Sequence, residues 1–231
     1  MTLHIVLPAA EPNSLVWVTD TLAGLGFQST GNLEKITYLE DRHAACSAWG
    51  NRALVLRDEF VRQLRFSQVD VSSPESMLEC LRSFAAQVPF TLGIQPSASA
   101  RENPGLIVTT FIDGRPRLFY CAIAMPPVAI QAANLTCVGD EDSPARVFVD
   151  YYYEMSGKSV EQVLFLGIHA MRLAHQNKTA FIGEPNAWIF QGGSFKRLTT
   201  PELTRFIEMS KSLDASITAY AESSPIVQRD P

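Results

Sequence analysis

Residues 31–50, GNLEKITYLEDRHAACSAWG, are the stretch of sequence that is most informative about the fold. The pattern predicts two short strands around a tight turn at residues 40–42, and the second strand is small and apolar until it reaches Gly50. Lys35 lies among apolar residues of the first strand. Because a lysine is almost never fully buried without a partner, its position calls for one. Asp20, at the end of the preceding predicted strand, is the candidate.

These features, with Thr2 near the start of the chain, resemble a known family. Asp20, the run GNLEKI, the turn DR and the strand end at Trp49 and Gly50 are similar to the N-terminal half of proteasome-type β subunits, including the bacterial HslV-like and Anbu-like relatives. Those proteins are N-terminal nucleophile hydrolases. The specific match covers residues 2–66, and the resemblance extends in outline over most of the chain.

Hydrophobic periodicity and turn signals divide the remaining chain into strands and helices. We expect a loop at 21–32, a hairpin turn at Asp113-Gly114 and helix starts at Ser73-Pro74, Ser159 and Thr200. The predicted strands are 2–8, 14–20, 105–112, 117–124, 134–138, 181–190 and 194–198; the predicted helices are 51–66, 74–88, 143–156, 159–176 and 200–220.

This order of strands, two helices, strands, two helices, strands and a last helix indicates an α+β fold in one domain. The resemblance implies more, namely a four-layer αββα sandwich of the N-terminal nucleophile hydrolase type over residues 1–231. Residues 223–231 are polar and are expected to be a frayed tail.

Composition narrows the classes of function. The net charge of -5 argues against a nucleic-acid surface, and no apolar run is long enough to predict a membrane span. The four cysteines are scattered in apolar runs without a CxxC motif, which favours core thiols in a reducing compartment. No signal-peptide pattern is evident, so we expect a cytoplasmic protein. No metal-binding spacing or cofactor motif is present, and we expect neither.

The resemblance implies a threonine nucleophile at the N-terminus. Removal of Met1 would leave Thr2 with a hydroxyl and a free α-amine, and that amine, with an unperturbed pKa of about 7.7–8.0, is a suitable base near pH 7. A Lys35 ammonium nearby would favour the neutral amine by like-charge repulsion, and Asp20 would hold the lysine charged and oriented. Backbone N–H groups at Trp49 and Gly50 would stabilise the oxyanion.

Other family positions are matched less closely. Gly139-Asp140-Glu141 stands where the family usually has a Gly-Ser-Gly-like turn, and Asn177 and Thr179 stand near its C-terminal aspartate and serine. Thr179 is the candidate for the assisting hydroxyl. Trp49 lies near the usual oxyanion glycine, with Gly50 one place later. The candidate substrate-pocket residues are Leu33, Ala48 and Trp49.

Two further groups have alternative interpretations. His4 shares a strand face with Thr2, so it would either line the substrate site or be an ordinary hydrogen-bonded strand histidine, and the second is the better default. The acidic residues 140–142 fit a solvated helix start better than a metal site.

The leading hypothesis is a threonine-type endopeptidase subunit, acting on peptides inside a ring or related oligomer of copies of the chain. Any ATP-dependent unfoldase would be a separate protein. The alternatives are a non-catalytic proteasome-like structural subunit and an N-terminal nucleophile amidase for a small molecule. Retention of Met1 would favour the first alternative.

Overall fold

The computed structural model of the chain describes residues 2–11, 13–25, 28–66, 71–96, 103–139, 144–155, 157–176 and 182–223. In chain order its elements are β1 (His4–Ala9), β2 (Ser14–Asp20), β3 (Leu22–Leu25), β4 (Gln28–Asn32), β5 (Thr37–Leu39), the 3₁₀ turn η1 (Glu40–Arg42), β6 (Ala44–Trp49), α1 (Ala53–Phe66), α2 (Pro74–Leu92), β7 (Gly105–Ile112), β8 (Arg115–Ala122), β9 (Val128–Ala132), β10 (Leu135–Val138), α3 (Pro144–Met155), α4 (Val160–Gln176), β11 (Pro185–Gln191), β12 (Ser194–Arg197) and α5 (Thr200–Ser223).

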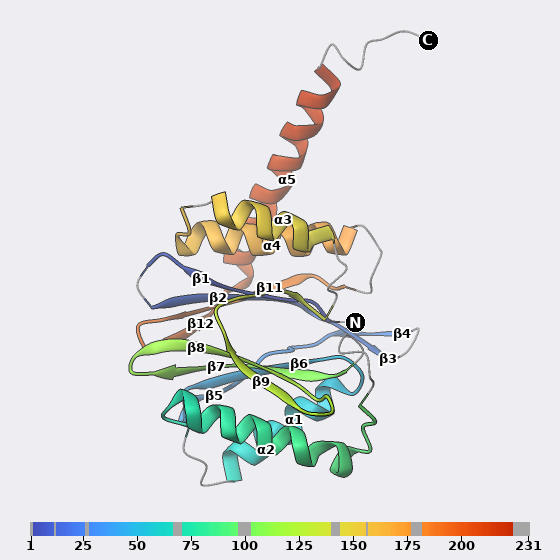
Figure 1. Ribbon diagram of the computed structural model, residues 1–231. Coiled ribbons are helices and arrows are strands. Elements are labelled where there is room, and N and C mark those ends of the chain that lie inside the picture. Colours follow the sequence, from blue (N-terminus) through green and yellow to red (C-terminus); the bar gives the residue numbers. More distant parts are fainter. Residues whose placement is uncertain are drawn as a thin grey trace.

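Two antiparallel five-stranded sheets lie face to face, with helices on both outer sides (Figure 1). One sheet has the order β10-β1-β2-β11-β12 and is covered by α3 and α4; the other has the order β5-β6-β7-β8-β9 and is covered by α1 and α2. A separate two-stranded ribbon of β3 and β4 lies near the N-terminus (Figure 1). The fold is the four-layer αββα sandwich that the resemblance implied.

Apolar side chains fill all three spaces between the layers. Because successive strand residues point to opposite faces, strands covered on both sides are buried on both faces, as along the whole of β2 and the first four residues of β1. Trp17, Trp49 and Ile107 belong to the cluster between the sheets. Separate clusters lie under α1 and α2 and under α3, α4 and the first turns of α5. The four cysteines are buried free thiols, as expected.

Local signals predicted most of the elements correctly. Asp113 and Gly114 both have positive φ, 52° and 69°, and join β7 to β8 in the predicted hairpin. Ser73 caps α2, where the Ser73 and Ser76 side chains bond reciprocally to backbone N–H groups. Gln162 and Ser159 form the predicted capping box at α4.

Residues 21–32 are a correction, because they are not a loop. β3 and β4 pair antiparallel there, and Leu22 lies opposite Asn32. The Gly- and Ser-rich composition disfavours a strand locally, but backbone pairing between the two segments overrides that preference. The strand β9 was also missed, since its apolar run is short and lies close to prolines.

The segment that contains β5, β6 and α1 differs in two details from the prediction. β5 begins at Thr37, so Lys35 precedes the strand instead of lying within it. The helix α1 begins at Ala53, and its buried face contains Leu56 where Leu54 was expected; Leu54 is 38% exposed. Leu56 is one turn from Phe60 on the same helix face, whereas Leu54 lies on the opposite side.

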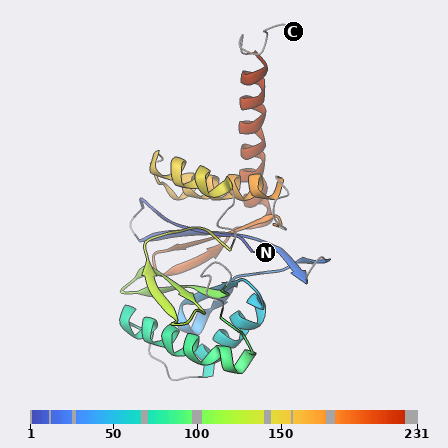
Figure 2. The same ribbon diagram turned by 45° about the vertical axis from the view of Figure 1, so that its right-hand side comes forward.

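The helix α5 leaves the layered body and projects away from it (Figures 1 and 2). Phe206 and Ser210 are its buried residues, so contact with the body is confined to its first half. The predicted frayed tail lies outside the described residues except for Ser223, which ends α5. Within the described ranges, no helix is both long and apolar enough to cross a bilayer.

Candidate active site

Thr2 lies directly before β1, at the edge of the space between the two sheets, and is partly buried. Gly139, just after β10, packs against its backbone. A Cβ on Gly139 would lie 1.9 Å from the Thr2 carbonyl oxygen, and the φ of Gly139 is +97°. Glycine is therefore required at 139 on both counts. This close approach explains why a glycine begins the family-like turn at residues 139–141. Residues 140 and 141 lie outside the described part of the chain.

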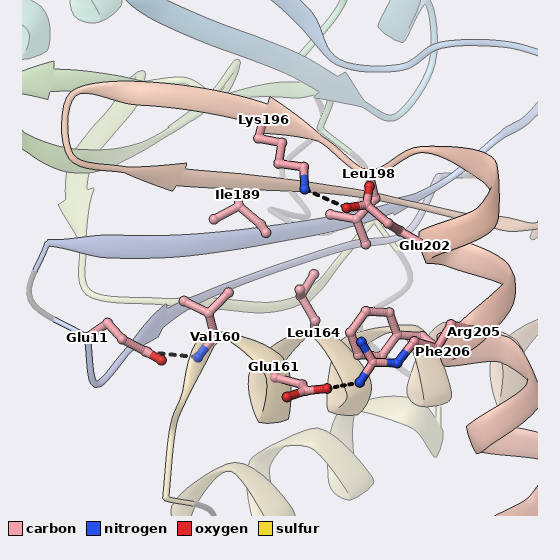
Figure 3. Close-up of a pocket in the computed structure, with 10 residues that line it drawn as sticks. All are labelled: Glu11, Val160, Glu161, Leu164, Ile189, Lys196, Leu198, Glu202, Arg205 and Phe206. Atoms are coloured by element: carbon pink, nitrogen blue, oxygen red, sulfur yellow. Dashed lines mark hydrogen bonds and ion pairs between the residues drawn. The ribbon is translucent and has the colours of Figure 1, made fainter.

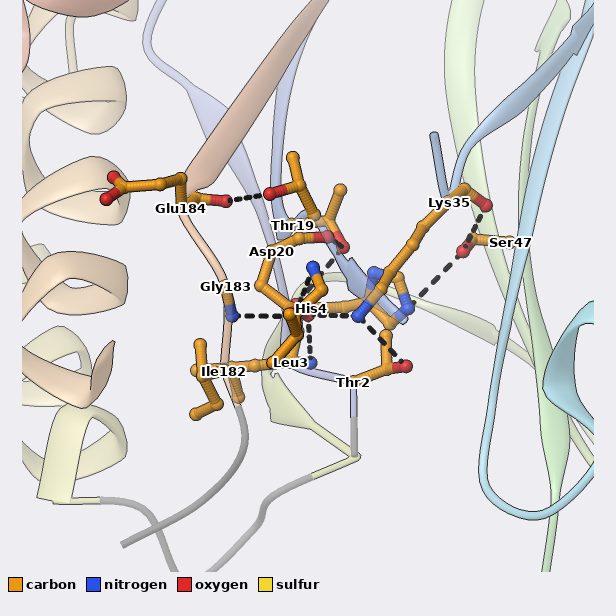
Figure 4. Close-up of polar contacts among 12 residues, drawn as sticks. Thr2, Leu3, His4, Thr19, Asp20, Lys35, Ser47, Ile182, Gly183 and Glu184 are labelled. Carbon is orange, nitrogen blue, oxygen red and sulfur yellow. Dashed lines mark hydrogen bonds and ion pairs between the residues drawn. The ribbon is translucent and has the colours of Figure 1, made fainter. Parts of the chain in front are cut away.

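Lys35 joins Thr2 to Asp20 (Figure 4). Its ammonium nitrogen Nζ is 2.7 Å from Asp20 Oδ1 and donates to Thr2 Oγ1 at 3.2 Å. Lys35 is 4% exposed and Asp20 is fully buried. Thr2 precedes β1, Asp20 ends β2, and Lys35 follows β4, so three separate segments bring these groups together.

The Asp20 carboxylate is held by backbone donors as well as by the lysine. Leu3 N–H donates to Oδ1 at 2.9 Å, while Leu22 N–H and Gly183 N–H donate to Oδ2 at 3.2 and 3.1 Å. A Cβ on Gly183 would lie 2.4 Å from the Leu22 nitrogen, so glycine permits the convergence of these two donors. These bonds offset the cost of burying the carboxylate and fix its orientation toward Lys35.

Two opposing effects act on the pKa of Lys35. Burial lowers the pKa of Lys35, and the charge and hydrogen bond of Asp20 raise it, offsetting part of that effect. A charged Lys35 beside Thr2 Oγ1 would stabilise an alkoxide at that oxygen and disfavour a positive charge on a nearby amine.

His4 is fully buried, which matches the ordinary interpretation of a hydrogen-bonded strand histidine. Its ring contacts Trp17 and Ser47 between the sheets. Burial, with a contribution from the Lys35 charge, lowers the pKa of His4 to about 3, so the ring is neutral at physiological pH. Ser47 was not identified from sequence; its alternation with Ala45 and Trp49 on the inner face of β6 was the available signal.

Gly50 directly follows β6, in a backbone conformation that favours glycine. Its φ is +86°, and a Cβ there would lie 2.7 Å from Pro104 Cα. Trp49, at 5% exposure, stacks on Tyr120 with ring centroids 4.7 Å apart. The Trp49 Cβ would be 3.4 Å from a Cβ on Gly139, so the end of β6 lies near the same glycine as Thr2.

The remaining predicted residues lie in different surroundings. Leu33 is partly buried, and its N–H donates to the Thr21 carbonyl at 2.7 Å. Ala48 is 5% exposed and packs in the cluster under α1 and α2, on the opposite face of β6 from Ser47. Thr179 and Asn177 lie outside the described residues.

A cavity of about 350 Å³ lies elsewhere, between α4, α5 and the β11–β12 hairpin (Figure 3). Its charged groups are paired: Lys196 with Glu202, Arg205 with Glu161, and Glu11 with the Val160 N–H. Thr2, Asp20 and Lys35 do not line it. Among the residues that the structure describes, no group of three or more His, Cys, Asp or Glu side chains is placed to hold a metal ion.

Comparison with known proteins identifies the fold. No protein-family model and no curated protein matches the sequence. The structure is similar to Anbu (ancestral beta-subunit) from Yersinia bercovieri, with a TM-score of 0.74 and 14% identity over 97% of this chain and 98% of that one. It is also similar to an Anbu (Gly-1) mutant from Hyphomicrobium sp. strain MC1, with a TM-score of 0.68 and 15% identity over the same shares. The chain therefore has the fold of Anbu, the proteasome β-subunit-like relative that its first 66 residues resemble.

Proposed function

We propose that the chain is a threonine-type endopeptidase subunit of a proteasome-like, self-compartmentalising complex. The observation that carries the proposal is the position of Lys35 Nζ, between Asp20 Oδ1 at 2.7 Å and Thr2 Oγ1 at 3.2 Å. A buried lysine that contacts both a hydroxyl and a carboxylate is placed to activate that hydroxyl as a nucleophile. A salt bridge alone would not require the hydroxyl.

Removal of Met1 precedes the reaction and leaves Thr2 with a free α-amine. The α-amine of Thr2 accepts the Oγ proton as Oγ attacks the scissile carbonyl carbon, and backbone N–H groups near Gly50 stabilise the oxyanion. The resulting ammonium gives its proton to the leaving amine, which leaves an ester on Thr2. Water then attacks the ester, the amine takes and returns a proton, and the carboxylic acid product departs.

Lys35 and Asp20 have distinct roles in this scheme. The Lys35 ammonium stabilises negative charge on Thr2 Oγ and disfavours protonation of the α-amine. Asp20 keeps the ammonium charged and aimed, since it is itself held by three backbone N–H groups. Thr179 remains the proposed assisting hydroxyl.

The pocket residues are also part of the proposal. Leu33 has the partial exposure that a side chain facing a substrate needs. Ala48 and Trp49, each 5% exposed, would contribute through the strand backbone. An apolar side chain of the peptide is the expected preference.

The decisive experiment is the intact mass of the purified protein after incubation with a peptide epoxyketone, which reacts with both the hydroxyl and the free amine of an N-terminal threonine. We expect loss of Met1 and one adduct, mapped to Thr2 by peptide sequencing. The Thr2→Ala variant tests specificity, since alanine also permits removal of Met1 but has no hydroxyl. A protein that retains Met1 and stays unmodified would favour the non-catalytic alternative.

That alternative has one specific observation in its favour. Asn177 stands near the position where the family has an aspartate, and an amide cannot carry that charge. The amidase alternative shares the core of the proposed site and is distinguished by substrate: Thr2 would react, but a library of peptides would not be cleaved.

Self-association is supported by apolar side chains that α3 and α5 leave exposed. Met209, Leu213, Ile217 and Tyr220 recur at four- and three-residue steps along α5, with Ile217 58% and Tyr220 77% exposed. On α3, exposed apolar residues also recur at helical spacing: Val147, Tyr151, Tyr152 and Met155. Large apolar patches on a surface commonly mark interaction sites, and a ring or related oligomer would cover them.

Light scattering coupled to size-exclusion chromatography tests this part. We expect the wild type to run as an oligomer and Ile217→Glu to run as a smaller species. Lys211→Glu introduces the same residue on the polar side of α5 and serves as the matched control. A monomeric wild type would contradict the oligomer. An ATP-dependent unfoldase would act as a separate partner on folded substrates.

A further inference from the structure

His4 lies two residues after Thr2. It is one member of a chain of hydrogen bonds that all point in the same direction. Trp17 Nε1, which can only donate, is 3.2 Å from His4 Nδ1. Nδ1 must therefore be the acceptor, which leaves the single proton of the neutral imidazole on Nε2. That nitrogen lies 3.3 Å from Ser47 Oγ and 3.5 Å from the Ala48 carbonyl oxygen.

Ser47 continues the same direction. Its hydroxyl has one proton, and it donates that proton to the Lys35 carbonyl oxygen at 2.7 Å. Ser47 Oγ can therefore only accept from His4 Nε2. The hydrogen bonds therefore run in one direction: Trp17 donates to His4, His4 donates to Ser47, and Ser47 donates to the Lys35 carbonyl oxygen. All three side chains are buried, so water does not compete for these bonds.

Lys35 needs such support, because residues 33–36 lie between β4 and β5 and outside any strand. Among the residues that the structure describes, the Lys35 carbonyl oxygen is therefore not part of a sheet ladder. It accepts from Ser47 Oγ at 2.7 Å and from Arg57 Nη1 at the longer distance of 3.3 Å. Arg57 also bonds the Glu34 carbonyl at 2.8 Å, so it orients mainly the preceding residue. The Ser47 bond is the shorter and fully buried contact at Lys35 itself.

We propose that His4 and Ser47 are positioning residues: the neutral imidazole orients the Ser47 hydroxyl, which holds the backbone of Lys35 so that its ammonium reaches Thr2 Oγ1. This inference rests on the proposed function for its catalytic consequence, although the positioning itself does not depend on that function. The lowered pKa of His4 agrees with the scheme, since a second proton on Nδ1 would face the Trp17 N–H.

The test compares two buried hydroxyls in the same sandwich. Ser47→Ala removes the link to Lys35, whereas Thr109→Val removes a fully buried hydroxyl on β7 whose oxygen has no hydrogen-bond partner within the described part of the chain. We measure the maximal rate constant and the half-saturating concentration for epoxyketone labelling of Thr2. Ser47→Ala should lower the maximal rate about 10- to 100-fold with little change in half-saturation, because small misplacements of a catalytic group have effects of that size. Thr109→Val should leave both unchanged.

A conservative variant and a second readout separate positioning from folding. Ser47→Thr retains the hydroxyl and should recover most of the labelling rate. The ¹⁵N–¹H signal of the Lys35 ammonium, assigned by its loss in Lys35→Met, should be protected from exchange in the wild type and in Thr109→Val but not in Ser47→Ala. This signal does not require activity.

The outcomes distinguish the two proposals. If the wild type is not labelled but Ser47→Ala still loses the protected Lys35 signal, the proposed peptidase fails and the positioning role stands. If Ser47→Ala labels within about twofold of wild type and keeps the Lys35 signal, or if Thr109→Val shows the same losses as Ser47→Ala, the positioning role is overturned.

Discussion

Two polar networks in this molecule contain the same kinds of residue, a cation, an aspartate, a histidine and a serine, but serve different purposes. Between the sheets, Lys35 pairs with Asp20 near a buried histidine, His4, and a buried serine, Ser47. Between α4 and α5, Arg172 pairs with Asp214 near His169 and Ser210. His169 Nδ1 and Arg172 Nε each lie 2.6 Å from Ser210 Oγ.

The difference lies in the cation and in what it reaches. An arginine is always charged and presents a rigid planar fork, whereas a lysine is a titratable point charge on a flexible stem. Arg172 donates hydrogen bonds to Ser210 and Asp214 of α5, so the helix network anchors α5 to the body. Lys35 reaches the hydroxyl of Thr2 as well as its partner carboxylate. The comparison teaches that a buried ion pair becomes a candidate for chemistry when its cation can titrate and also touches a nucleophile.

The largest effect should come from Asp20→Asn, which leaves the Lys35 ammonium buried without its counter-charge. Breaking a buried pair on one side typically costs about 3–5 kcal/mol of the free energy of unfolding, and labelling of Thr2 should fall with it. Urea denaturation measures the first effect and intact mass the second. The double variant Asp20→Asn/Lys35→Met should recover part of the stability but no labelling. A loss below about 1 kcal/mol would show that Asp20 is not the counter-charge.

The lowered pKa values of His4 and His169 predict that the free energy of unfolding falls in acid, with a contribution from each network. Burial is the main cause that lowers the pKa of His4 to about 3 and that of His169 to about 4, and Arg172 contributes to the second. Because the unfolded chain binds these protons near pH 6.5, the stabilisation is fully present above that pH and is lost as the pH falls toward each folded pKa.

The expected loss is on the order of 3 kcal/mol for each histidine, measured as the free energy of unfolding between pH 7 and pH 4. His4→Gln and His169→Gln should each flatten that dependence. Only His4→Gln should also slow labelling at pH 7, which is the contrast between the networks. An unchanged pH dependence in both variants would contradict the assignment.

Arg172→Met should have a smaller effect than Asp20→Asn, because Asp214 is 35% exposed and water can solvate the carboxylate that the variant leaves behind. We expect a loss of about 1–3 kcal/mol and no change in the labelling rate per folded molecule. If labelling slows as much as in Asp20→Asn, the two networks are not functionally distinct.

The smallest effect should come from Ser210→Ala, the counterpart of Ser47→Ala. It removes one buried hydroxyl that bridges His169 and Arg172, which should cost about 1 kcal/mol. Thr2 labelling should be unchanged. Comparison of thermal unfolding and labelling for the two serine variants separates a hydroxyl that anchors a helix from one that positions Lys35.

Much of the fold was predictable, because its signals are local. The Asp113-Gly114 turn and the caps at Ser73 and Ser159 depend on residues within three or four positions of one another. The pairing of β3 with β4 was missed, since a Gly- and Ser-rich segment forms strands only when a partner segment supplies the hydrogen bonds. The exposure of Leu54 was missed because the start of α1 sets which helix face is buried.

The candidate site was predictable in part for the same reason. The need of Lys35 for a partner, and Asp20 as that partner, followed from residue type and order. The donors at Leu22 and Gly183 did not, since Gly183 is 163 residues from Asp20 and their contact arises only when β11 pairs with β2. Ser47 escaped notice because a serine in an apolar strand has no distinctive spacing.

The sequence by itself determined most of the elements, the α+β class and the pairing of Lys35 with Asp20, because periodicity, capping and the cost of burying a lone lysine are properties of residue types. The layered sandwich and the place of Thr2 beside that pair were implied by the resemblance to proteasome-type β subunits. Only the tertiary structure decided that four donors converge on Asp20, that His4 and Ser47 support Lys35, and that α5 projects from the body. Those outcomes depend on contacts between residues far apart in the chain, and such contacts exist only after the two sheets and their helices have packed.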